Sequence, residues 1–148
     1  MRGYAYWTQK GPSKAGKGRI FRAGIEIPVG EAAENRTDIE PLLDGLPEPV
    51  YLELDEESQR YYWNDRGEHP TGCSLNTVDL NGLVEPTNLK AKKILARHFN
   101  ELIGLKLGCN GEVYVIDLGG SLYCIKDGKA VLYRENGCYT GVSLYIVH

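Results

Sequence analysis

The residue types best suited to chemistry stand together near the start of the chain, in residues 11–18, which read GPSKAGKG. Three glycines and two lysines are what a phosphate-binding loop uses. The nucleotide-binding loop of that type ends in Lys followed by Ser or Thr, whose hydroxyl holds Mg²⁺, and Gly18 stands in that place. The segment that follows, RIFRAGIEI, alternates apolar and other residues as a strand does, whereas that loop opens a helix. We therefore interpret the stretch as a flexible, basic connection between two strands.

A looser anion site in residues 10–19 remains an alternative, because exposed backbone amides beside cations attract phosphate. Aromatic side chains close to such cations are able to stack on a base. The candidate ligand-binding residues for a nucleotide or another phosphate-bearing small ligand are Lys14, Lys17, Arg19, Tyr6, Trp7, Tyr62 and Trp63.

His69 and Cys73 form the second group with reactive side chains, in the irregular sequence HPTGCSLN. A cysteine beside a histidine is able to act as a nucleophile or as half of a metal site. No helix signal follows Cys73 to activate a thiolate, and no further ligands stand at metal-binding spacing. We therefore assign no catalytic residue, no metal and no cofactor, and keep a small enzyme using Cys73 or His69 as a second alternative.

The composition describes one ordinary domain, residues 1–148, with a formal net charge of −3. That charge gives no general attraction to nucleic acid or to an anionic membrane. The N-terminus lacks the apolar core of a secretory signal, and no apolar run has the length of a membrane span. The four cysteines include no C-x-x-C pair, so we expect reduced thiols and a cytoplasmic protein.

The secondary structure expected around these residues predicts an α+β fold. Thr37 and Glu40 form a capping box before a short helix over residues 38–44. The apolar stripe in residues 88–104 predicts one long helix. Strands are expected at residues 3–8 and 21–27, in a hairpin over 50–63, and in a C-terminal meander of four, at 112–118, 121–126, 129–134 and 142–148.

The meander is predicted to be apolar on both faces. If Gly119-Gly120 is a two-residue turn, Leu118 faces Ser121, and Val113 and Val115 then lie on the face opposite Tyr123. A sheet with one solvated face alternates apolar with polar residues, so this second face must be covered by the N-terminal strands, in a sandwich or partial barrel, or by a partner.

Ten tyrosines add to that expectation, since tyrosine is enriched at interfaces. The sequence thus predicts a non-catalytic binding module of the inhibitor or antitoxin kind, which recognises a protein partner or associates with itself through an aromatic-rich sheet surface.

Overall fold

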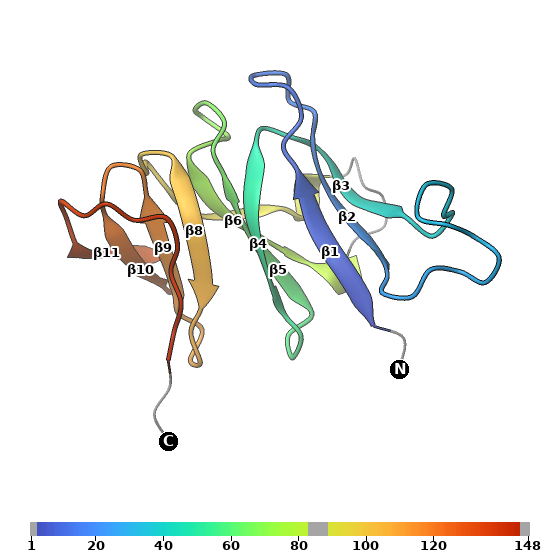
Figure 1. Ribbon diagram of the computed structural model, residues 1–148. Coiled ribbons are helices and arrows are strands. Elements are labelled where there is room, and N and C mark those ends of the chain that lie inside the picture. The colour runs from blue at the N-terminus through green and yellow to red at the C-terminus, as the bar shows by residue number, and fades with distance from the viewer. Residues whose placement is uncertain (1–2, 83–88, 146–148) are drawn as a thin grey trace.

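The computed structural model describes residues 3–82 and 89–145 and contains three antiparallel sheets in chain order (Figure 1). The first sheet contains β1 (Tyr4–Gln9), β2 (Gly18–Gly24) and β3 (Glu40–Leu46). The middle sheet contains β4 (Pro49–Asp55), β5 (Arg60–Asp65), β6 (Ser74–Asp79) and β7 (Lys93–Arg97). The last sheet contains β8 (Leu102–Leu107), β9 (Val113–Asp117), β10 (Leu122–Lys126) and β11 (Lys129–Arg134). Two single 3₁₀ turns, Leu80–Gly82 and Leu89–Ala91, complete the described elements.

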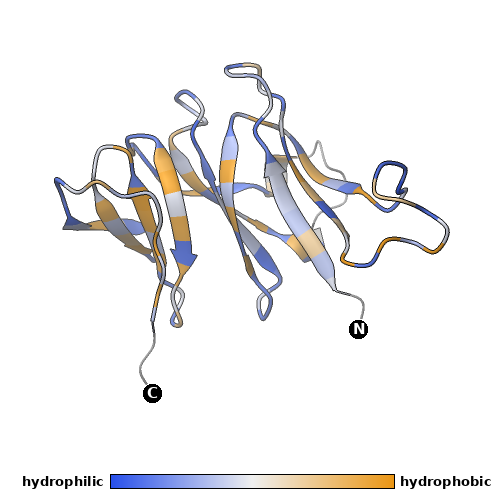
Figure 2. Cartoon of the chain, viewed as in Figure 1, coloured by the Kyte–Doolittle hydropathy of each residue, from blue (hydrophilic) through white to orange (hydrophobic). Residues whose placement is uncertain are grey.

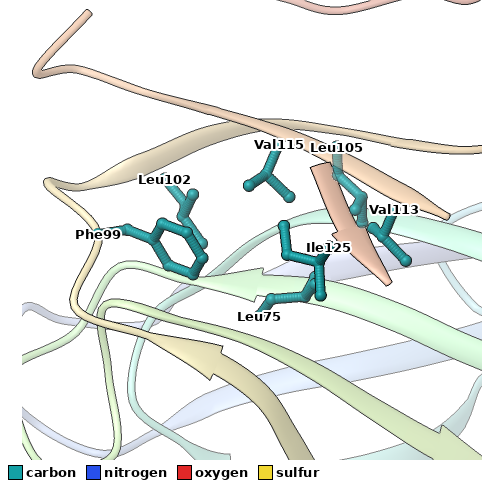
Figure 3. Close-up of a cluster of buried hydrophobic side chains, with 7 residues drawn as sticks. All are labelled: Leu75, Phe99, Leu102, Leu105, Val113, Val115 and Ile125. Carbon is teal, nitrogen blue, oxygen red and sulfur yellow. The ribbon is translucent and has the colours of Figure 1, made fainter. Parts of the chain in front are cut away.

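The sheets stand side by side, and the middle one is covered on both faces (Figure 1). Tyr61 and Trp63 of β5 are fully buried against Ile20 and Leu43 of the first sheet. On its other face the middle sheet contributes Leu75 to a second core with the last sheet. Figure 3 shows this core, which contains Leu75, Phe99, Leu102, Leu105, Val113, Val115 and Ile125. Hydrophobic residues accordingly concentrate on the strands, as Figure 2 shows for β8 to β10.

The three sheets repeat one unit. Trp7 of β1, Trp63 of β5 and Val115 of β9 occupy equivalent positions, because the residue after each of them pairs with the following strand in the same way. Thr8 pairs with Ile20, Asn64 with Leu75, and Ile116 with Leu122. Face-to-face packing of consecutive four-stranded meanders is the arrangement of neighbouring blades in a β-propeller. The sequence prediction found no long repeat, because the loops between the matching strands differ in length and composition.

The α+β prediction is wrong, since the described residues are almost entirely antiparallel strand. The predicted helix over 88–104 is replaced by β7, a turn and β8. His98 and Glu101 adopt positive φ, which a helix does not accept, and the flanking strands bury apolar residues on neighbouring sheets. The stripe of Leu95, Phe99 and Leu102 fits both structures, and tertiary packing decides between them.

The predicted short helix over 38–44 is also wrong, since these residues fall largely in β3. Thr37 does not cap a helix: its hydroxyl donates to Glu31 Oε1 at 2.8 Å, and its amide donates to Glu31 Oε2 at 2.7 Å. The expected hairpin at 50–63 is confirmed as β4 and β5, and the two expected N-terminal strands as β1 and β2.

The C-terminal meander differs from its prediction in two ways. Its fourth strand is β8, at the other edge, whereas residues 141–145 form no strand and residues 146–148 lie outside the described part. The register at Gly119-Gly120 is shifted by one residue, because Leu122 pairs with Ile116 and the turn is longer than two residues. That shift moves Val113 and Val115 to the same face as Tyr123 and Ile125, which is the face buried against the middle sheet.

Within residues 3–82 and 89–145, the helical turns are far too short to cross a membrane.

Candidate binding surface

The surface that stands out is the face of the last sheet turned away from the middle sheet, formed by Tyr114, Leu122, Cys124, Val131 and Tyr133. We call it the outer face of the last sheet. Val131 and Tyr133 are 54% and 58% exposed, and the ring of Tyr133 packs edge-on to Tyr114 with centroids 6.0 Å apart.

The equivalent face is buried in the other two sheets. Ile20 of the first sheet and Leu75 of the middle sheet correspond to Leu122 of the last sheet, and both are fully buried by the sheet that follows them in the chain. Leu122 is half-buried and Cys124 is buried, so the exposed part of this face is its edge strand, with Val131 and Tyr133. Burial of apolar side chains is the main favourable term in association, so this face is the strongest candidate for a contact.

The first sheet has a corresponding open face on its far side. Trp7 is 36% exposed, and its ring stacks on Phe21 of the neighbouring strand at 5.5 Å with an interplanar angle of 18°. Trp63, at the equivalent position of the middle sheet, is fully buried. The first sheet therefore offers an aromatic surface where the next sheet has a packed core.

A cavity of about 680 Å³ adjoins the first sheet beneath the connection between β2 and β3. Its walls include Tyr4, Ile25, Ile27 and Val29, with the carboxyl groups of Asp38 and Glu40 at one side. The pKa of Asp38 is lowered to about 2, chiefly because the Arg36 guanidinium hydrogen-bonds its carboxylate. Asp38 Oδ2 also accepts from the Gly24 amide at 3.0 Å, which ties the connection to β2.

The cations of the predicted phosphate loop face carboxylates. Lys14 lies 2.7 Å from Glu68, whose hydrogen bond raises the pKa of the lysine. Lys10 lies 3.0 Å from Glu48, and this contact lowers the pKa of the Glu48 carboxyl. Arg19 belongs to β2 and lies 3.1 Å from Asp44 of β3. A phosphate at this loop would have to compete with three carboxylates of the chain.

The aromatic residues predicted to accompany the loop do not gather around it. Trp63 is buried in the first core, and Tyr6 packs edge-on against Tyr61 with ring centroids 5.1 Å apart. Tyr62 points to the opposite face, toward the second core. Of the four aromatic residues in the prediction, Trp7 has the largest exposed fraction. Lys17 is exposed near the tip of the loop.

His69 and Cys73 lie at the same end of the molecule, beside a groove of about 420 Å³ lined in part by Lys14, Glu68, His69 and Lys92. His69 packs against His98 with ring centroids 5.4 Å apart, whereas the Cys73 thiol donates to the Arg66 carbonyl at 3.6 Å. The histidine and the thiol thus have separate partners. In the part of the chain that the structure describes, no group of three or more histidine, cysteine, aspartate or glutamate side chains is placed to hold a metal ion.

The sequence did not single out two further ionisable groups: Lys92, which lines this groove and is half-buried, and Asp65, which is fully buried. Burial raises the pKa of the Asp65 carboxyl and lowers the pKa of the Lys92 ammonium. Asp65 Oδ1 accepts from the Glu48 amide at 2.6 Å and from the Gly67 amide at 3.3 Å, so its role is to fix the loop before β4. The sequence feature that could have drawn attention to Asp65 is its position shortly after the aromatic run YYW, residues 61–63.

The sequence matches no family model. It is 49% identical over 150 residues to a protein of Pyricularia oryzae named low-density lipoprotein receptor-related protein 1, covering 97% of this chain and 47% of that protein. It is 44% identical over 152 residues to the 3-hydroxyacyl-CoA dehydrogenase-like protein LAM1 of Cochliobolus heterostrophus, covering 96% of this chain and 32% of that protein. The chain thus spans less than half the length of either relative.

Proposed function

We propose that this protein is a non-catalytic binding module that recognises a protein partner through the outer face of the last sheet. The main support is that Tyr133 is 58% exposed, whereas Leu42 and Leu95 at the equivalent positions of the two preceding sheets pack against the buried cores. A tyrosine-rich apolar surface gives large contact area at low cost in side-chain entropy, which favours a protein as the occupant.

One relative is named as receptor-related and the other as dehydrogenase-like, and neither name gives an activity for this chain. Dinucleotide-dependent dehydrogenases bind their cofactor on a parallel βαβ unit with a glycine-rich first turn. In this chain, the segment shared with the dehydrogenase-like relative folds into antiparallel sheets, which supports a binding role over a dehydrogenase role. Four free cysteines support the proposal of a reducing, cytoplasmic location.

A photo-crosslinking amino acid placed at position 133 tests the proposed function in cells of the source organism. Tyr51 is the matched control position, since it is a 40% exposed tyrosine on the middle sheet. We expect covalent protein adducts from position 133 and none of comparable yield from position 51. Equal yields from the two positions, or no adduct from position 133, would contradict the proposal.

A further inference from the structure

The segment that follows the last sheet has the spacing of apolar residues found in the opening strands of the other two sheets: Val142 and Leu144 match Val50 and Leu52 of β4 and Ile103 and Leu105 of β8. Gly45 stands seven residues before Leu52 of β4, and His98 stands seven residues before Leu105 of β8. Gly137 stands seven residues before Leu144 in the same way. Residues 141–145 therefore correspond to β4 and β8, the strands that open the middle and last sheets.

These residues also lie where such a strand belongs. Gly141 Cα lies 3.6 Å from the position that a Cβ atom would take on Gly104 of β8, and Figure 1 shows the C-terminal segment running beside β8. In the same way β8 lies beside β4, joined by the ion pair of Lys106 Nζ with Glu53 Oε1 at 2.9 Å. Residues 141–145 thus occupy the place of the opening strand of a fourth sheet, without strand partners among the described residues.

The first sheet has the complementary gap. Its strand β1 corresponds to β5 and β9, which each pair with two neighbours, one of them the opening strand of the sheet. Within the described residues β1 pairs with β2 alone, so its other edge is open. An open edge presents unpaired amide and carbonyl groups that recruit another strand.

We propose that the partner is a second copy of this chain, whose residues 141–145 pair antiparallel with β1, so that two copies close a ring of six four-stranded sheets. The inference rests on the proposed function, because it names the occupant of the outer face. Under a two-fold axis both open edges are filled at once, and the outer face of each last sheet packs on Trp7 and Phe21 of the other copy. The opening strand of every sheet in the ring then has a strand partner.

The register of the exchanged strand follows from the other sheets. Leu52 pairs with Trp63, and Leu105 pairs with Val115. The equivalent pair between copies is Leu144 with Trp7, which directs both side chains toward the outer face of the partner's last sheet.

The primary test is the mass of the full chain in solution, by light scattering or sedimentation over a wide concentration range. We expect a dimer of twice 16.5 kDa. Val131→Asp places a charge on the outer face and Leu144→Pro blocks strand pairing, and each is expected to weaken dimerisation by at least tenfold. Val29→Asp, at a fully exposed valine in the connection between β2 and β3, is the matched control and is expected to leave the dimer unchanged.

A thermal melt of each variant shows whether the monomer is still folded when the dimer is lost. Residue 144 lies outside both cores, so Leu144→Pro should leave the monomer folded. Tryptophan emission gives a second readout: dilution should shift it to longer wavelength as Trp7 is released, and Trp7→Phe should abolish the shift while Trp63 stays buried.

A monomer at every concentration, or a dimer insensitive to both Val131→Asp and Leu144→Pro, would overturn the inference. A monomer that nevertheless forms crosslinks from position 133 to a different protein would leave the proposed function standing.

Discussion

Lys10 of the first sheet and Glu48 before the middle sheet form an ion pair at 3.0 Å, and Arg66 with Glu101 repeats this pair one sheet further along the chain. Each basic residue directly follows the strand that carries Trp7 or Trp63, and each glutamate precedes the opening strand of the next sheet. A lysine that the sequence placed in a phosphate-binding loop thus joins neighbouring sheets.

Glu48→Gln should destabilise the protein, because Glu48 is almost fully buried and also accepts from the Ser13 hydroxyl and the Lys14 amide. Loss of a charged acceptor of this kind costs about 1–3 kcal/mol. Glu101→Gln is the matched control, since that carboxylate is 48% exposed and its pair with Arg66 is worth less than about 1 kcal/mol. Urea denaturation measures both, and equal losses would contradict this account.

Lys14→Ala and Lys17→Ala discriminate the alternative phosphate-binding function. The carboxylates of Glu48 and Glu68 already neutralise this loop, so we expect no binding of ATP or inorganic phosphate that depends steeply on salt or on either lysine. Glu68→Gln should increase any anion binding, since it frees Lys14. Calorimetry at low salt decides the matter: wild-type binding that each alanine abolishes would favour the ligand-binding alternative over the present proposal.

Asp117→Ala should loosen the last sheet. Asp117 is buried, its Oδ2 accepts from the Asn100 amide at 3.1 Å, and its Oδ1 accepts from the Ser121 amide at 3.0 Å. Leaving these donors unsatisfied costs about 1–3 kcal/mol. Gln9 occupies the equivalent place in the first sheet but is exposed, so Gln9→Ala should change the free energy of unfolding by less than about 0.5 kcal/mol. Thermal denaturation of the two variants checks the contrast.

Substitution by alanine should destabilise the protein much more at Trp63 than at Trp7. Trp63→Ala removes a fully buried ring from the first core and should cost about 3–5 kcal/mol. Trp7→Ala should cost much less when dilute protein is unfolded, because that ring is exposed at one face. A large loss for Trp7→Ala in protein shown to be monomeric would contradict the burial described here.

Acid should release the connection between β2 and β3 first. The folded-state pKa of Asp38 is about 2, below its ordinary value of 3.8, so its contribution is complete above the ordinary value and is lost as the pH falls from there toward 2. An NMR titration should report this pKa, and Arg36→Ala should return it toward 3.8. A value near 3.8 in the unaltered protein would exclude the Arg36 contact.

Strands with a clear local pattern of apolar residues could be predicted from the sequence alone. Alternation in residues 50–63 predicted β4 and β5, because the period of apolar side chains is set by neighbouring residues. The sequence also indicated that the C-terminal strands are apolar on both faces.

The secondary structure of residues 88–104 and the location of the exposed surfaces depend on tertiary packing. Leu95, Phe99 and Leu102 have spacing that suits a helix, but strands at β7 and β8 bury them between two sheets and complete both ladders, which is worth more than local propensity. Which apolar face is covered depends on contacts between residues far apart in the chain. Burial of Trp63 and exposure of Trp7 therefore follow from the order of the sheets, although the two residues occupy equivalent places in their strands.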